Sequence, residues 1–343
     1  MNKNETKVLV FGYFGKKSNI QEGQSVKTRN MSRLFKEMGC NVEEFDTESF
    51  RYDKLAIFKM IRQLIKCQKL CLLPAYHNLK FFSPILFVFS KLFRYDIYLF
   101  TIGGRLHIYL KSLPIHRWMM RRIKCVFNET HMLGNYLHNI HGYTNLEYCP
   151  NIKFISFTPQ KYHTDGELHL VFLARIMIEK GIDVIFGYAD WLAKHSRSNV
   201  IIDFYGMIDP KDKVYFEEQV EKYKFVTYKG VAQQADIPNI LEKYDAMLFP
   251  THYPTEGIPG SIIDAYNAGI PVVASDWTYA RELIEDNETG FIVPFEDNQD
   301  DFNYACERLL NDTKKLNHMK DEAKARAAEY FADNAKQILS KYF

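Results

Sequence analysis

Short runs of consecutive apolar residues recur along the whole chain, and most are followed by a segment whose apolar residues have helical spacing. A run that is apolar at every position is typical of a strand buried on both faces, and such strands occur in parallel sheets covered by helices. One series of runs ends near residue 127, and a second begins at residue 168. The pattern therefore predicts the α/β class, with two successive domains that each contain a doubly wound parallel sheet.

The expected elements fall into two sets, separated by a linker over 151–166 that carries Pro159 among polar residues. Strands are expected over 7–11, 41–45, 97–101 and 125–127, and then over 168–173, 200–205, 226–228, 246–250, 272–274 and 291–293. Helices are expected over 24–38, 55–68, 180–194, 211–223, 235–243, 261–268 and 300–310, with one long last helix over 316–342. We place the domains at 1–157 and 158–318, and we expect a C-terminal helix over 319–343 to pack back toward the first domain.

Composition bounds the class of protein and its location. The chain has 343 residues, of which 47% are hydrophobic and 25% charged, so it is neither disordered nor fibrous. Its six cysteines include no Cys-x-x-Cys pair, which favours a reducing, cytoplasmic setting without a zinc site or disulfide framework. The first residues lack the pattern of a secretory signal. The longest apolar stretch, 81–90, is about half of the roughly 20 residues needed to span a bilayer.

The net charge of +2 (44 Lys and Arg against 42 Asp and Glu) hides a strong asymmetry. Residues 1–150 hold 23 basic and 11 acidic side chains, net +12, whereas residues 151–343 hold 21 and 31, net −10. Residues 54–95 contain eight basic and no acidic side chains, interleaved with phenylalanines. Such a segment suits an anionic membrane surface, although solvated helix faces are the simpler alternative. The basic helical stripe is expected to consist of Lys59, Arg62, Lys66 and Lys69. No nucleic-acid-reading motif accompanies the charge, so nucleic acid is not an expected partner.

Two basic residues follow the first strand of the second series. Arg175 comes directly after strand 168–173 and Ala174, and Lys180 stands at the start of the next helix. Ligands of α/β proteins gather at the carboxyl ends of parallel strands. Two cations near a helix N-terminus at this edge indicate a site for a diphosphate.

The segment that follows strand 246–250 is the densest in chemistry. Glu256 stands in a loop with Gly257 and Gly260, whose backbone N–H groups are free of side-chain bulk and can face an anion. Asp264 lies about one turn inside the next helix. The loop therefore offers a carboxylate and backbone donors at the same edge of the sheet as Arg175.

The ordered segments LARIMIEKG (173–181), TEGIPGSIIDAYNAGIPVVASD (255–276) and TGFIVP (289–294), together with Glu282, resemble the retaining nucleotide-sugar glycosyltransferases of family 4. The resemblance covers nearly all of 165–310 and is looser before that, where it rests on the opening strand, its glycine loop and Cys149-Pro150-Asn151. It implies the GT-B fold, in which two Rossmann-like domains face a central cleft. It also implies a metal-independent enzyme without a cofactor, a bacterial polysaccharide-biosynthesis setting and a nucleotide-sugar donor, for which we expect a UDP-sugar.

The resemblance implies roles for individual residues. Arg175 and Lys180 would bind the donor diphosphate, Glu256 would hold the donor sugar, and Asp264 would hold the ribose. The catalytic set is then Glu256, Arg175 and Lys180. The donor-binding set is Gly12, Gly15, Gly23, Gly206, Val231, Gly257, Ile258, Pro259, Gly260, Ser261 and Asp264. His107 and His131 follow strands of the first domain and are assigned to the acceptor side.

Each assignment has a simpler structural alternative. Arg175 and Lys180 could belong to a solvated helix start, and Glu256 could be a helix-cap carboxylate. Asp264 could be an exposed helix residue, and it is one methylene shorter than the family's glutamate. Gly12 and Gly15 could serve only a tight turn, and the two histidines could be packing or surface residues. Ala174 also departs from the family, which has glycine before the arginine.

These observations predict a hexosyltransferase that adds a sugar to a lipid-linked saccharide acceptor. We expect it to be peripheral at the cytoplasmic face of the cell membrane, in capsule, exopolysaccharide or lipopolysaccharide synthesis. Two alternatives stay open. One is a same-fold enzyme such as a nucleotide-sugar epimerase or a phosphorylase, and the other is a non-catalytic, membrane-associated partner subunit of another glycosyltransferase.

Overall fold

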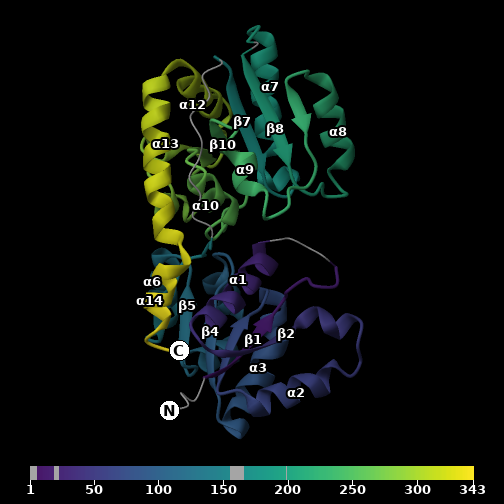
Figure 1. Ribbon diagram of the computed structural model, residues 1–343, viewed down its shortest axis with the longest axis vertical. Helices are drawn as coiled ribbons and strands as arrows, with labels where there is room; N and C mark the ends of the chain where they lie inside the picture. The colour runs from purple at the N-terminus through teal and green to yellow at the C-terminus, as the bar shows by residue number, and fades with distance from the viewer. Residues whose placement is uncertain (1–5, 19–22, 155–165, 198) are drawn as a thin grey trace. The chain divides into compact units, whose positions relative to one another are not determined.

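The computed structural model describes residues 6–18, 23–154, 166–197 and 199–343 (Figure 1). Its contacts divide the chain into two units. Unit 1 comprises Met1–Phe154 and Phe331–Phe343, and unit 2 comprises Ile155–Tyr330. Most of the expected linker over 151–166, and the domain boundary placed between residues 157 and 158, lie outside the described residues. Each unit contains one six-stranded sheet whose paired strands are parallel.

Unit 1 has the strand order β2-β1-β3-β4-β5-β6. The strands are β1 (Lys7–Gly12), β2 (Asn41–Asp46), β3 (Lys69–Leu73), β4 (Asp96–Phe100), β5 (Cys125–Asn128) and β6 (Leu146–Tyr148). The four strands predicted in this half of the chain are confirmed. β3 and β6 were not predicted from the sequence. β3 follows a strong helical pattern after only two residues, and β6 has three half-buried residues.

The helices of unit 1 lie on both faces of its sheet. They are α1 (Gly23–Glu37), α2 (Ala56–Lys66), α3 (Tyr76–Phe93), α4 (Leu106–Tyr109), α5 (Pro114–Met120), α6 (His131–His141) and α14 (Ala332–Leu339), with short 3-10 turns at Thr47–Arg51 and Leu110–Ser112. Leu34 of α1 and Leu339 of α14 share one buried cluster with Val8 and Val10 of β1. Phe11 points to the opposite face, where its ring meets Phe82 of α3 at 5.1 Å.

Unit 2 has the strand order β12-β11-β10-β7-β8-β9. Its first strand, β7, lies in the interior of the sheet, and the order reverses around it, as in a doubly wound sheet. The strands are β7 (Leu168–Leu173), β8 (Val200–Tyr205), β9 (Val226–Tyr228), β10 (Ala246–Phe249), β11 (Val272–Ser275) and β12 (Gly290–Val293). All six were predicted to within one residue, because each is a continuous or nearly continuous apolar run.

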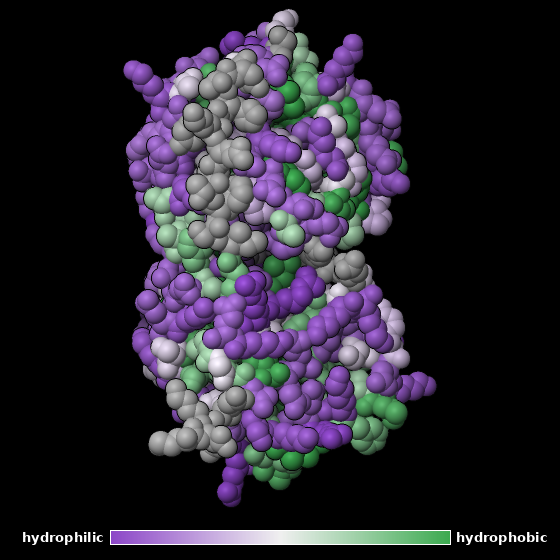
Figure 2. All heavy atoms as spheres, in the orientation of Figure 1, coloured by the Kyte–Doolittle hydropathy of each residue, from purple (hydrophilic) through white to green (hydrophobic). Residues whose placement is uncertain are grey.

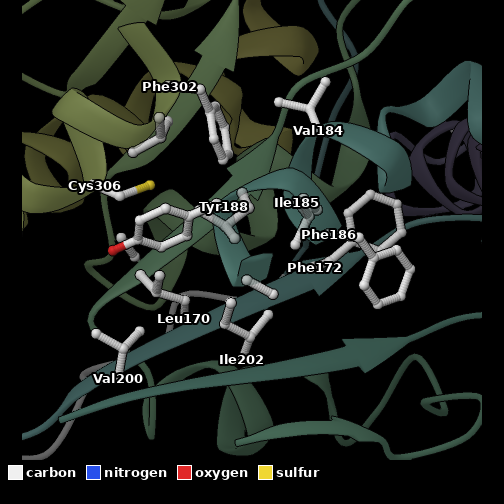
Figure 3. Packing of buried hydrophobic residues seen from close by; sticks show 14 of the residues in the cluster. Leu170, Phe172, Val184, Ile185, Phe186, Tyr188, Val200, Ile202, Phe302 and Cys306 are labelled. Carbon is white, nitrogen blue, oxygen red and sulfur yellow. The ribbon is translucent and has the colours of Figure 1, made fainter. Parts of the chain in front are cut away.

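The helices of unit 2 connect these strands and bury large side chains against them. They are α7 (Ile182–Lys194), α8 (Lys213–Lys222), α9 (Ile237–Leu241), α10 (Gly260–Asn267), α11 (Ala280–Leu283), α12 (Gln299–Asn311) and α13 (Thr313–Ala327), with short 3-10 turns at Ile178–Lys180 and Ala328–Tyr330. Figure 3 shows Phe186 and Tyr188 of α7 near Phe172 of β7 and Phe302 of α12. All four side chains are at most 2% exposed, so they belong to the close-packed core of unit 2.

The last segment of the chain differs from the single helix expected over 316–342. It forms α13 in unit 2 and α14 in unit 1 (Figure 1, yellow). Between them Phe331 is extended and makes a parallel bridge with Lys153, whose carbonyl accepts a hydrogen bond from the N–H of Ala332 at 3.0 Å. The Ala/Lys/Glu-rich composition favours helix throughout, so the break depends on this tertiary contact.

The C-terminal residues are anchored within unit 1. The ring of Phe343 lies 4.8 Å from that of Tyr98 and 4.5 Å from that of Phe35. The Lys69 ammonium donates to the carbonyl of Tyr342, whose hydroxyl donates to Glu147 at 2.9 Å. Among the described helices, none is both long enough and apolar enough to cross a membrane.

We predict that Leu339→Ala lowers the free energy of unfolding of unit 1 by about 2–5 kcal/mol, because Leu339 is fully buried and its loss leaves a cavity. The matched control is Gln337→Ala on the exposed side of α14, which should change stability by less than about 0.5 kcal/mol. Urea denaturation followed by circular dichroism measures both. Equal effects would show that α14 does not pack on this sheet.

Candidate active site

The site residues predicted in the second half of the chain gather where the strand order of unit 2 reverses. The first strand, β7, pairs with β8 on one side and with β10 on the other. Arg175 follows β7, and the loop with Glu256 follows β10. In open α/β sheets the ligand crevice lies at such a switch point, outside the carboxyl ends of the strands. The topology therefore brings the two predicted loops to one place.

Lys180 and Glu256 form an ion pair, although they are 76 residues apart in sequence. The side chains are 22% and 15% exposed, so the pair is largely shielded but reachable from solvent. The Lys180 ammonium also lies 5.7 Å from the ring of Phe249 and 5.8 Å from that of Tyr253. Both aromatic residues were missed in the sequence analysis. Arg175, at the end of β7, has an exposed side chain.

Backbone contacts join the loop after β7 to the loop after β10. The carbonyl of Glu179 accepts hydrogen bonds from the N–H of His252 at 3.1 Å and the hydroxyl of Thr251 at 3.2 Å. Gly181 has a φ of +80°, and a Cβ at this position would overlap the carbonyl oxygen of Pro250. Glycine is therefore required by both backbone conformation and space. This close approach places Lys180 beside the second loop.

The glycine-rich loop leads directly into α10. The helix begins at Gly260, and its N-cap is Pro259, whose side chain has no group that could make a capping hydrogen bond. Glu256 lies upstream of the N-cap, and its carboxylate is paired with Lys180. The alternative in which Glu256 is the helix-cap carboxylate is therefore wrong. Gly257 and Ile258 are buried, whereas Pro259, Gly260 and Ser261 are partly exposed at the start of the helix.

Asp264 is buried within α10, with 9% of its surface exposed. The alternative of an ordinary exposed helix residue is therefore wrong. Burial of a carboxylate is costly unless it is paired or hydrogen-bonded, and Asp264 does have an interaction.

Gly206 and Val231 follow β8 and β9 at the same edge of the sheet. Gly206 has a φ of +147°, and a Cβ there would overlap the carbonyl oxygen of Ala174. Packing against the segment before Arg175 thus explains this glycine without any ligand. Its carbonyl accepts a hydrogen bond from the Tyr228 hydroxyl at 3.0 Å. Val231 is 55% exposed, so its side chain is available to a ligand.

A second ion pair beside the site was missed in the sequence analysis. The ring nitrogen Nε2 of His252 lies 2.9 Å from a carboxylate oxygen of Asp183 in the first turn of α7. The hydrogen bond with Asp183 raises the pKa of His252 above its ordinary value of 6.5. The position of His252, three residues after β10 in the densest motif, was the available sequence signal.

In unit 1, the predicted glycines follow or precede secondary structure at the carboxyl edge of the sheet. Gly12 ends β1, and a Cβ there would come within 2.9 Å of the carbonyl oxygen of Leu73. Gly15 has a φ of +63°, which a turn glycine adopts easily. Gly23 begins α1 in open space, since a Cβ added there would meet no atom within 4 Å. Close packing and turn geometry account for Gly12 and Gly15.

The two acceptor-side histidines have different environments. His107 is 8% exposed and stacks on Tyr136 at 4.6 Å, and burial lowers its pKa. Its Nδ1 lies 3.1 Å from the carbonyl oxygen of Gly104. His131 is exposed at the first position of α6 and stacks on Tyr148 at 4.0 Å. Of the two, His131 is the more accessible to a ligand.

A buried ion pair organises the carboxyl edge of the first sheet. Lys27 of α1 pairs with Glu129, which follows β5, and both side chains are 4% exposed. The Lys27 ammonium also donates to the carbonyl of Thr101 at 2.8 Å, and Glu129 accepts from the N–H of Gly103 at 3.1 Å. The pair thus ties α1 to the loops after β4 and β5. The pair could not be predicted from the sequence, because the two residues are 102 positions apart.

Over the described part of the chain, no group of three or more His, Cys, Asp and Glu side chains is arranged to hold a metal ion. All six cysteines are free thiols.

Two helix-covered parallel sheets in one chain, with the candidate site at the switch point of the second, define the GT-B class of folds. The crystal structure of Anabaena Alr3699/HepE in complex with UDP superposes with a TM-score of 0.76 at 15% sequence identity, covering 98% of this chain and 99% of that one. The family model described as glycosyl transferases group 1 matches residues 155–326, half of the chain. The protein therefore belongs to the glycosyl transferases group 1 family.

Curated relatives match over part of their length. Alpha-D-kanosaminyltransferase of Streptomyces kanamyceticus is 26% identical over 48% of this chain and 42% of its own. Amylovoran biosynthesis glycosyltransferase AmsK of Erwinia amylovora is 26% identical over 44% of this chain and 40% of its own. UDP-Gal:alpha-D-GlcNAc-diphosphoundecaprenol alpha-1,3-galactosyltransferase of Escherichia coli is 34% identical over 24% of this chain and 21% of its own. The chain thus spans about two fifths of the length of the first two relatives.

We predict that Gly181→Ala destabilises unit 2 more than Gly230→Ala does. Both glycines have a φ between +80° and +85°, but a Cβ at Gly230 meets no atom within 4 Å. Gly230→Ala should therefore show only the backbone cost, about 1–2 kcal/mol. Gly181→Ala should add the cost of separating the loop after β7 from Pro250. Urea denaturation compares the two, and equal losses would mean that the close approach is unimportant.

We predict that Lys27→Met lowers the stability of unit 1 by about 3–5 kcal/mol, because it leaves the buried Glu129 carboxylate without its partner. The double variant Lys27→Met, Glu129→Gln should recover part of that loss. Lys124→Met is the control, since its pair with Asp96 is about half exposed on both sides and should be worth less than about 1 kcal/mol. Similar losses for Lys27→Met and Lys124→Met would contradict the assignment.

Proposed function

We propose that the protein is a retaining, metal-independent glycosyltransferase that moves a hexose-type sugar from a nucleotide-sugar donor to a saccharide acceptor. The observation that carries the proposal is the Lys180–Glu256 ion pair at the switch point of unit 2, inside the region that the family model matches. A cation and a carboxylate next to a glycine-rich helix start can bind a diphosphate and a sugar side by side.

In this proposal the donor diphosphate binds Lys180 and Arg175. An ammonium has three N–H donors, so Lys180 can bind a phosphate oxygen and still donate to Glu256. As the bond between the anomeric carbon and the phosphate oxygen breaks, negative charge grows on the departing nucleoside diphosphate. Fixed cations and the backbone N–H groups of Gly257, Ile258 and Gly260 stabilise that charge without having to reorganise.

The remaining residues of unit 2 hold the rest of the donor. Glu256 accepts hydrogen bonds from hydroxyls of the donor sugar, and the buried Asp264 accepts from the ribose. Gly206 and Val231 line the base. Because HepE was crystallised with UDP, we propose UDP as the nucleotide of the donor.

The acceptor hydroxyl attacks on the face from which the nucleotide leaves. Its oxygen bonds to the anomeric carbon, and its proton passes to the departing phosphate oxygen, so that no side-chain base is required. The basicity of the phosphate oxygen that accepts this proton then depends on the same two cations that stabilise the leaving group.

We further propose that the acceptor is a saccharide on a lipid carrier, at the cytoplasmic face of the membrane, in cell-surface polysaccharide synthesis. One relative is named for transfer to a diphosphoundecaprenol-linked sugar and another for amylovoran biosynthesis, which supports a lipid-linked acceptor and an exopolysaccharide product. Unit 1 would bind the acceptor at the carboxyl edge of its sheet. Of the two predicted histidines, the exposed His131 is a better acceptor contact than the buried His107.

We predict that Lys180→Met and Glu256→Gln each lower kcat/KM for sugar transfer by about 10²–10³-fold. The first removes a cation that stabilises the departing diphosphate, and the second weakens both the sugar contact and the ion pair that holds Lys180. Lys180→Met should also weaken binding of UDP, which we expect to bind the unchanged protein more tightly than ADP or GDP. Transfer assays with UDP-sugars and calorimetric titration of the nucleotides measure these effects.

The matched control is Lys211→Met. Lys211 pairs with Glu179, the neighbour of Lys180 in sequence, and half of its side chain is exposed. This variant should keep normal transfer and UDP binding. Transfer by Lys180→Met and Glu256→Gln at the rate of the unchanged protein would place the site elsewhere. Tight UDP binding without transfer or donor hydrolysis would instead indicate a non-catalytic partner subunit.

A further inference from the structure

We propose that the outer surface of α2, α3 and α5 inserts shallowly into the interface of an anionic lipid bilayer. This deepens the proposed function, on which it rests, by naming the surface through which the enzyme reaches a lipid-linked acceptor. We call this surface the apolar face. It consists of Phe58 and Ile65 of α2, Phe81, Ile85, Val88 and Leu92 of α3, and Ile115 and Trp118 of α5.

The strongest part of the apolar face is a stripe along α3. Phe81, Ile85, Val88 and Leu92 follow the i, i+4, i+7, i+11 spacing of one helix face, and they are 70%, 46%, 62% and 67% exposed. The side of α3 that faces the sheet is also apolar, as the fully buried Leu86 shows. A helix that is apolar on both sides, with one side open to solvent, indicates an interaction surface.

The three helices belong to one layer of unit 1. The connections from β2 to β3 and from β3 to β4 cross the sheet in the same direction, and right-handed crossovers place α2 and α3 on the same face. Both α2 and α5 pack against α3. The ring of Trp118 lies 5.6 Å from that of Phe87, and a ring nitrogen of His116 lies 3.0 Å from the carbonyl oxygen of Lys80. Figure 2 shows green, hydrophobic side chains at the lower edge of unit 1, where Figure 1 draws α2.

Basic side chains surround the apolar face. Residues 54–128 contain 14 Lys and Arg but a single acidic residue, Asp96, whose carboxylate lies 3.8 Å from the Lys124 ammonium. Lys59, Arg62 and Lys66 are exposed along α2. The expected fourth member of that stripe, Lys69, is not on the helix, since it begins β3 and binds the carbonyl of Tyr342.

Two further cations lie directly over aromatic rings of this layer. The Lys91 ammonium is 5.1 Å from the ring of Phe87, and the Arg122 guanidinium is 4.2 Å from that of Trp118. Long basic side chains placed around apolar ones can reach lipid phosphates while the apolar groups enter the acyl boundary.

Charge complementarity selects the bilayer over a second copy of the chain. A two-fold dimer through the apolar face would place the same cationic surface opposite itself, with almost no carboxylates to compensate. Anionic lipid headgroups offer the opposite charge, at about 1 kcal/mol for each basic residue near the surface. They also cover an apolar surface that would otherwise contact water.

The test uses the full chain, sedimented with vesicles of phosphatidylcholine alone or mixed with phosphatidylglycerol. We expect binding to the mixed vesicles, and we expect Phe81→Ser, Val88→Ser, Leu92→Ser in one protein to reduce it at least about tenfold. Lys59→Gln, Arg62→Gln, Lys66→Gln should reduce it at low salt. The matched control is Val214→Ser on α8 of unit 2, because Val214 is 69% exposed and should have no effect on binding.

Insertion has a spectroscopic signature of its own. Trp118 is 48% exposed, whereas Trp277 is 1% exposed, so brominated lipids should quench the fluorescence of Trp118 selectively. Trp118→Phe supplies the background from the other tryptophans. Vesicle binding by the triple serine variant equal to that of the unchanged protein, or absence of Trp118 quenching, would overturn the proposal. So would a dimer in sedimentation velocity that the serine substitutions dissociate.

UDP titration of the same variants separates the two proposals. The serine variant should bind UDP normally, which shows that unit 2 is folded. Its urea unfolding transition, followed by circular dichroism, should match that of the unchanged protein, which shows that unit 1 is folded as well. Failure of vesicle binding with normal UDP binding and transfer to a soluble acceptor would reject the apolar face and leave the proposed transferase. Vesicle binding with neither UDP binding nor transfer would support the apolar face and reject the proposed transferase.

Discussion

The close approach of Gly181 to the carbonyl of Pro250 is the constraint on which the candidate active site depends. It brings the start of α7 against the end of β10, so that a lysine from one loop meets a glutamate from the other. The parallel sheet supplies the two strand ends, but only a residue without a Cβ permits this spacing. The same kind of contact recurs at Gly206 and Ala174, so the strand ends of unit 2 are packed backbone to backbone around Arg175. Loops packed in this way can hold charges in place before a ligand arrives.

Buried ion pairs play a comparable part away from the candidate site. Lys27 and Glu129 tie three segments of unit 1 together, and Lys320 of α13 pairs with Asp245 just before β10, with side chains 3% and 5% exposed. The carboxylate of Asp245 also accepts from the N–H of His169 at 2.9 Å, at the start of the neighbouring strand. Such pairs add little net stability compared with apolar residues, but removal of one partner is costly. They therefore fix which segments are adjacent, and in both units those segments lie at the ends of sheet strands.

The α/β class and the strands of unit 2 could be predicted because buried parallel strands consist of nearly continuous runs of apolar residues. β3 could not, since KLCLL directly follows a helical pattern and shares its lysine spacing. The break before α14 was equally hidden, because Ala/Lys/Glu-rich sequence has no local reason to stop being a helix. In the candidate site, Arg175, Lys180 and Glu256 were predicted from an ordered motif. The pair of His252 and Asp183, 69 residues apart, carries no such pattern and emerges only from the folded chain.

The charge asymmetry of the sequence corresponds to a particular part of unit 1. The excess of basic side chains is concentrated in 54–128, which forms much of the helix layer that contains the apolar face. A uniformly basic domain would attract any polyanion, but cations interleaved with exposed apolar side chains favour a surface that offers both negative charge and a hydrocarbon interior. In unit 2 the cations of the site act against an acidic background, with Lys180 held by Glu256. In the two proposals, therefore, the basic charge of 54–128 acts over a surface, and the charges of Arg175 and Lys180 act at one site.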